Sequence, residues 1–148
     1  MAYTLSGTLV SSCSLTHVSG VGLGSYSATI AKSNTKTFTT SDITKLYHAT
    51  RSLTGTTPET LDVTSGLTDG FNVALNFATI KGIFIVNKHA TATLTLGGGA
   101  NPLFNALPPI PGLGHIELAL TITTSGTVKN ILATPSGTMT YDIVLVGT

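Results

Sequence analysis

Most of the chain is divided into short β-branched segments by glycine, proline and serine turns, and this pattern is compatible with few folds other than an all-β one. Residues 60–65, T-L-D-V-T-S, alternate strictly between apolar and polar side chains. Residues 80–87, I-K-G-I-F-I-V-N, form a nearly continuous apolar run, which predicts a central strand covered on both faces. Residues 91–96 follow a turn and are predicted to form a hairpin with that strand. The other predicted strands are residues 43–53, 115–122, 127–133 and 138–146.

The near-regular spacing of these strands predicts a single-domain antiparallel β-sandwich of jelly-roll type, with little or no helix. A chain of 148 residues can bury a core without help from a disulfide or a metal. Only residues 69–77 could form a turn or two of helix, and a loop fits them equally well. In the last strand Tyr141, Ile143 and Leu145 are expected to face the core, or the solvent if the strand lies between two layers.

The N-terminal 25 residues differ in composition from the rest of the chain. Gly20, Gly22 and Gly24 interrupt a stretch rich in serine and threonine, which weakens the prediction of a regular strand there. We therefore predict two parts: residues 1–25 as a flexible arm or first strand, and residues 26–148 as the β-sandwich domain. We expect the arm to reach a neighbouring subunit.

Charged side chains are scarce, and this limits the classes of partner. Only 9% of the residues are charged and the net charge is +1, so the chain has no basic patch of the kind that binds nucleic acid or an anionic membrane. No apolar run approaches the roughly 20 residues of a membrane-spanning helix, and the first residues do not resemble a signal peptide. We expect synthesis in the cytoplasm. A surface with few charges does little to prevent association, so we expect the protein to function within an assembly.

The cysteine and histidine pattern predicts neither a metal site nor a reactive thiol. Cys13 is the only cysteine, and we expect it to be a small buried hydrophobe. The histidines lack the H-E-x-x-H and His-x-His spacings of metal ligands, and surface or core-edge positions are the better interpretation. They are His17, His48, His89 and His115.

Catalytic and cofactor motifs are also missing from the sequence. The G-x-S-x-G turn of serine hydrolases does not occur. Glu59 and Glu117 are the only glutamates, and two carboxylates on a β-sandwich do not make a glycosidase. The chain has no tryptophan with which to build a sugar-stacking platform. We therefore predict no catalytic residue, cofactor or metal.

Residues 97–114, G-G-G-A-N-P-L-F-N-A-L-P-P-I-P-G-L-G, could be a phosphate-binding loop or a connector between two sheets. The sequence favours the connector, because no Lys-Ser or Lys-Thr follows the glycines and prolines replace the helix that would hold an anion. Its apolar side chains are too many to leave in water, so they must pack on the domain or meet a partner. These candidate interface residues are Leu103, Phe104, Leu107, Ile110 and Leu113; contact with another subunit is expected at Phe104 and Leu107.

The order of these features resembles the small β-sandwich virion proteins of tailed bacteriophages. The resemblance is carried by L-Y-H-A-T-R-S-L, E-T-L-D-V-T-S-G-L-T-D-G, F-A-T-I-K-G-I-F-I-V-N, T-L-T-L-G-G-G, P-G-L-G-H and T-M-T-Y-D-I-V-L-V-G. In particular the chain is similar to capsid cement or decoration proteins of jelly-roll type over most of residues 40–148. These motifs are strand and turn patterns, and similar sandwiches also occur in tail and fibre proteins.

The resemblance implies a non-enzymatic structural protein of the virion. Such a protein would decorate the capsid surface, contact the major capsid protein and copies of itself as a dimer or trimer, and bridge neighbouring capsid subunits. The alternative that the same resemblance leaves open is a tail or fibre component that binds a receptor or glycan. A small sandwich-fold hydrolase and a sugar-binding module are the remaining alternatives.

Overall fold

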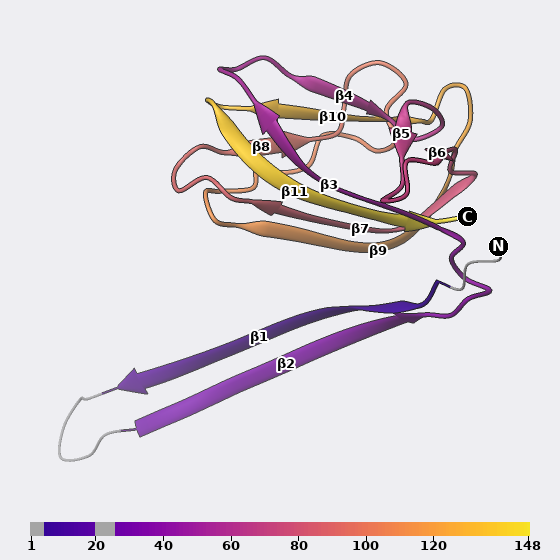
Figure 1. The fold of residues 1–148 in the computed structure, drawn as a ribbon. Helices are drawn as coiled ribbons and strands as arrows, with labels where there is room; N and C mark the ends of the chain where they lie inside the picture. Colours follow the sequence, from indigo (N-terminus) through magenta and orange to yellow (C-terminus); the bar gives the residue numbers. More distant parts are fainter. Residues whose placement is uncertain (1–4, 20–25) are drawn as a thin grey trace.

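The computed structural model describes residues 5–19 and 26–148, with side chains described for residues 5–16 and 29–148. Its regular elements are all β-strands, and every pair of strands in its sheets is antiparallel. Figure 1 shows two parts: a sandwich-like body, and a long two-stranded arm that projects from it. The predicted all-β sandwich class is confirmed.

The body consists of two principal sheets and a small two-stranded one. In the four-stranded sheet the order is β3 (Lys45–Leu53), β11 (Met139–Gly147), β7 (Thr79–Asn87) and β9 (His115–Thr123). The three-stranded sheet has the order β4 (Glu59–Asp62), β10 (Asn130–Pro135) and β8 (Leu94–Leu96). The short strands β5 (Leu67–Thr68) and β6 (Ala74–Leu75) pair with each other. A jelly roll has eight strands in two sheets, and this arrangement does not establish one.

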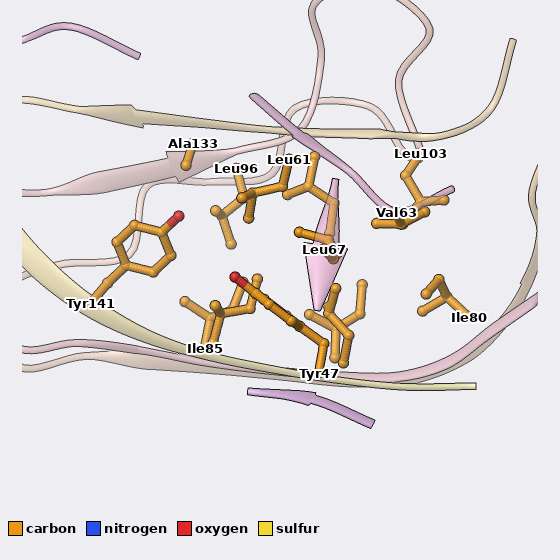
Figure 2. Packing of buried hydrophobic residues seen from close by; sticks show 14 of the residues in the cluster. Tyr47, Leu61, Val63, Leu67, Ile80, Ile85, Leu96, Leu103, Ala133 and Tyr141 are labelled. Carbon is orange, nitrogen blue, oxygen red and sulfur yellow. The ribbon is translucent and has the colours of Figure 1, made fainter. Parts of the chain in front are cut away.

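The core lies between the two principal sheets, as Figure 2 shows. Strand β11 alternates between buried and half-buried residues along its whole length, and Tyr141, Ile143 and Leu145 all point into the core. They meet Leu61 and Ala133 of the other sheet within one apolar cluster. Period-two alternation therefore groups these residues on one face correctly, because successive side chains of a strand leave on opposite faces, and the structure selects the inward orientation of the two that were expected.

The first two strands form the arm. Strand β1 (Gly7–Ser19) pairs with β2 (Tyr26–Phe38) over thirteen residue pairs, from Gly7 opposite Phe38 to Ser19 opposite Tyr26. The predicted boundary after residue 25 is therefore misplaced, because β2 belongs with β1 rather than with the sandwich. The glycines at 20, 22 and 24 lie in the segment outside the described residues.

Residues 97–114 run from β8 in the three-stranded sheet to β9 in the four-stranded sheet, so the connector interpretation holds. The segment is bonded to the body along its length: the amides of Leu107 and Ile110 donate to the carbonyls of Leu96 and Leu94, at 2.8 Å each. Gly97 needs to be glycine, since its φ is 89° and a Cβ there would lie 2.5 Å from the carbonyl oxygen of Asn105.

Two local predictions need correction. Residues 80–87 and 91–96 do not form a hairpin: β7 pairs with β11 and β9, whereas β8 pairs with β10 in the other sheet. For residues 69–77 the structure has the alternative without a helix, a turn followed by the short strand β6. Strand β7 is central, as expected, but only its inward face is fully covered.

Candidate interaction surfaces

The base of the arm is fixed to the outer face of the four-stranded sheet. A Cβ added at Gly82 of β7 would lie 2.9 Å from Leu9 Cδ1 and 3.2 Å from Phe38 Cζ, so this glycine lets both side chains approach the strand. Phe38 is 3% exposed. The turn that follows is held by Asp42, whose Oδ2 accepts bonds from the Thr39 amide and hydroxyl, each at 2.8 Å. These bonds lower the pKa of Asp42.

Beyond its base, the arm side chains that the structure describes form no core of their own. Leu15 and Ile30 face each other across the two strands and are 63% and 61% exposed, and Val10 on the opposite face is 57% exposed. Cys13 is also exposed, so the prediction that it is a buried hydrophobe is wrong. The only side-chain hydrogen bond described within the paired strands joins the hydroxyls of Thr16 and Thr29, at 3.2 Å. A ribbon of two strands with so little burial is at best marginally stable by itself.

The five connector residues predicted as an interface separate into three groups. Leu103 and Ile110 are 4% and 3% exposed and belong to the core, so they are not available to a partner. Phe104 and Leu107 are half-buried against that core. Leu113 is 70% exposed and has a φ of 59°.

The conformation of Leu113 costs free energy, because a left-handed backbone brings Cβ close to the carbonyl oxygen, at roughly 1–2 kcal/mol. Its backbone amide is engaged, donating to the carbonyl of His89 at 2.8 Å. Its side chain, in contrast, contributes little to the core. The fold thus tolerates strain at a leucine that it does not use for packing.

A polar cluster joins the two sheets at one end of the body. The Arg51 guanidinium of β3 forms an ion pair with Glu59 of β4, and the Tyr141 hydroxyl of β11 donates to Glu59 Oε2 at 3.0 Å. Arg51 Nη1 also donates to the Tyr47 hydroxyl at 3.3 Å. Burial raises the pKa of Tyr141 to about 12, so its hydroxyl stays protonated and able to donate. Glu59 is therefore occupied as an acceptor that holds strands together.

The two glutamates do not form a catalytic pair. Glu59 is bound to Arg51 and Tyr141 between the sheets, whereas Glu117 lies opposite Phe84, on the outward-facing register of β7 and β9. The four-stranded sheet stands between them. General acid–base cleavage of a glycoside needs two carboxylates that face one bond, and this arrangement cannot supply them.

The three histidines with described side chains lie at separate places and make different contacts. His48 and His115 are exposed on β3 and at the start of β9, and the His115 ring lies 6.1 Å from that of Phe84. His89 is used in a turn, where its Nδ1 accepts bonds from the amides of Thr91 and Ala92. The side chain of His17 lies outside the described residues. Among the residues that the structure describes, no three His, Cys, Asp or Glu side chains are grouped so as to hold a metal ion.

The exposed pair of Leu15 and Ile30 was missed by sequence reasoning. A signal was present: two thirteen-residue segments rich in serine and threonine flank the glycines at 20–24, as the strands of a hairpin flank its turn. Their alternation is weak because threonine and serine occupy both faces.

Comparison with known proteins yields no further guide to the function. No protein-family model matches the chain, and neither the curated proteins nor the solved structures contain a match. No helix in the described part of the chain is long and apolar enough to cross a membrane.

Proposed function

We propose that the chain is a non-enzymatic structural protein of a virion, which decorates and cements the outer capsid shell by bridging neighbouring major capsid proteins. The observation that most supports an assembly role is the arm. It orders two thirteen-residue strands, but the apolar side chains described beyond its base, Val10, Leu15 and Ile30, are all exposed. Ordering a residue costs about 1–2 kcal/mol of backbone entropy, so an arm of this length gains most of its stability from neighbouring molecules.

The polar chemistry of the body supports the same role. Its ion pairs, Arg51–Glu59, Lys88–Asp142 and Lys129–Asp62, join strands or anchor turns. A surface with few charges loses little hydration when it is covered, and many weak contacts add up when copies are held on a lattice. The resemblance to capsid decoration proteins is the reason for proposing the outer capsid shell as the assembly.

Leu113 is the candidate contact with the shell. It combines exposure with backbone strain, and strain that the fold does not need is a reason to suspect a binding role. Leu113→Gly removes the side chain and relieves the strained φ together. We expect unchanged or slightly higher stability, by up to about 1 kcal/mol, with weaker attachment to the shell. The matched control is Asn101→Gly, which relieves a φ of 51° in the same connector without removing an apolar group.

The experiment that tests the proposed function is electron cryo-microscopy of the particle, with the density of this protein located. Density repeated over the icosahedral shell is the expected result. Density confined to the tail would overturn the cement role in favour of the alternative, a tail or fibre component. Equal shell attachment by Leu113→Gly and Asn101→Gly would remove Leu113 as the contact without affecting the larger proposal.

A further inference from the structure

The outer face of the four-stranded sheet is apolar although it faces away from the core. Strand pairing places Val144 between His48 and Phe84, and Val146 between Leu46 and Gly82. Val86 continues the same face along β7. None of its large apolar side chains is fully buried. They are Leu46, Phe84, Val86, Val144 and Val146.

The protein covers one end of this face with the base of its own arm. Leu9 and Phe38 pack over Gly82 there, and the apolar hollow beneath them is also lined by Leu46 and Val146. The side chain of Lys36, opposite Leu9 in the arm, lies over the Phe38 ring with its Nζ 5.8 Å from the ring centroid. The arm thus meets the sheet with a leucine flanked by a lysine and an aromatic ring.

The other end of the face is an open groove, which we name the β7–β11 groove. It is lined by His48, Thr50, Phe84, Val86, Asp142 and Val144. A run as apolar as that of β7 is typical of a strand covered on both faces, and within one copy the outward cover stops at the arm base. The groove is therefore the part of this face that the chain leaves uncovered.

Of the two carboxylates in or beside the groove, one is paired and one is not. Asp142 is paired with Lys88 at 3.3 Å and accepts a bond from Thr50 at 2.5 Å. Glu117, directly opposite Phe84, has no ion-pair partner among the residues that the structure describes. The two histidines near this face are His48 and His115. An arriving lysine would find an unpaired carboxylate beside the apolar floor.

The outer half of the arm has the matching chemistry. Residues 7–38 contain Lys32 and Lys36 and no aspartate or glutamate. On the arm face that carries Leu9, the next pairs along the ribbon include Cys13 opposite Lys32 and Leu15 opposite Ile30. The exposed end of this face therefore repeats the apolar and cationic combination that its base already presents to the sheet.

We propose that the exposed pair of Leu15 and Ile30 in one copy docks in the β7–β11 groove of a second copy, with Lys32 next to Glu117. A thirteen-residue strand is about 40 Å long, whereas the nine-residue strands of the sheet span about 30 Å. In Figure 1 the arm and the four-stranded sheet diverge from the base toward the tip. The outer half of the arm is thus carried away from the groove of its own chain.

The first test is self-association of the full chain, measured by analytical ultracentrifugation. The wild type is expected to associate reversibly, and Leu15→Ser with Ile30→Ser to weaken the association at least tenfold. Val10→Ser is the matched control, because Val10 is equally exposed but on the other face of the arm. A wild type that stays monomeric up to its solubility limit, or a loss as large in the control, would overturn the proposal.

The second test uses the single cysteine of the chain. Because Cys13 lies beside Leu15 on the docking face, His48→Cys in the groove should form an intermolecular disulfide with it in oxidised glutathione. Thr57→Cys, in the exposed turn between β3 and β4, is the control and should give no increase in covalent dimer. Linkage between two Cys13 residues, at the same level with or without His48→Cys, would show that arms pair with each other and that the proposal is wrong.

This docking concerns two copies of the chain and does not depend on a capsid. A protein that self-associates through the groove but locates to no shell rejects only the proposed function. Shell decoration by the Leu15→Ser, Ile30→Ser variant at unchanged copy number, together with unchanged self-association, rejects only the docking.

Discussion

The arm and the body are built from the same kind of element but are stabilised differently. Strands β1 and β2 have one partner strand each, and beyond the base the side chains described on them are exposed. Strands β7 and β11 each have two partner strands and a face packed into the core. A hairpin can therefore have complete pairing between its strands and still lack the packing that makes strands stable in water.

The two parts also differ in how many groups they leave available for contacts with other molecules. Polar groups between the two sheets of the body are bound to each other, as the Arg51–Glu59–Tyr141 cluster shows. The arm leaves an apolar pair and two lysines to solvent. Contacts with other molecules should therefore change the arm far more than the body.

The largest expected difference between the two parts is in the rates at which their backbone amides exchange hydrogen. In dilute, monomeric protein we expect amides of β11 to exchange at least about 1,000-fold more slowly than those of β1 and β2, because core amides open only with global unfolding. Mass spectrometry of the exchanging protein measures both. Equal protection in the monomer would show that the arm is as stable as the body and would remove the contrast.

Truncating the core should cost far more than truncating the arm. Phe77 is 0% exposed and lies in the apolar cluster, so Phe77→Ala should lower the free energy of unfolding by about 3–5 kcal/mol. Urea denaturation measures the change. A loss below about 1 kcal/mol would mean that the core at this position collapses to fill the space.

The buried side chain of Asn87 forms hydrogen bonds with two loops of the body. It is fully buried, its Nδ2 donates to the carbonyls of Ala92 and Pro111, and its Oδ1 accepts from the amide of His89. Asn87→Ala leaves these groups unpaired and should cost about 2–3 kcal/mol.

The exposed Asn105 provides the control for this variant in the same denaturation experiment. Asn105→Ala should change the free energy of unfolding by less than about 0.5 kcal/mol. Similar small effects in both variants would contradict the role of Asn87.

Acid should weaken the body through Asp62. Burial raises the pKa of this carboxyl, but bonds from Lys129 and Thr64 outweigh it and leave the pKa below the ordinary 3.8. Its contribution is therefore complete above about pH 5 and declines as the pH falls below the unfolded value. Asp62→Asn should cost about 1 kcal/mol at neutral pH and progressively less in acid, measured by urea denaturation across pH. A constant difference between the two proteins would contradict the linkage.

The smallest effect is expected in the arm. Ile30→Ala removes a side chain that is 61% exposed and should change the stability of the dilute monomer by less than about 0.5 kcal/mol. Calorimetry at low concentration checks this value. A loss close to that of Phe77→Ala would show that Ile30 packs against its own body in solution.

Several elements were predictable because their signals are local. The alternation of the last strand placed Tyr141, Ile143 and Leu145 in the core, and the glycines and prolines of residues 97–114 identified a connector between sheets. The candidate interface was only partly predictable. The sequence marks Leu103 and Leu113 as equally apolar, and only the packed structure distinguishes the buried side chain from the exposed one.

What the sequence by itself determined is the strand class, the approximate positions of the strands in the body and which residues of β11 share a face, since a period of two is a property of consecutive residues. Only the tertiary structure decided that residues 80–87 pair with β9 and β11 rather than with the next segment, and that β1 and β2 pair with each other as an arm. It also left the outer face of β7 half covered. The physical reason is that the choice of a strand's neighbours depends on which distant segments compete to cover its apolar faces, and no local pattern records that competition.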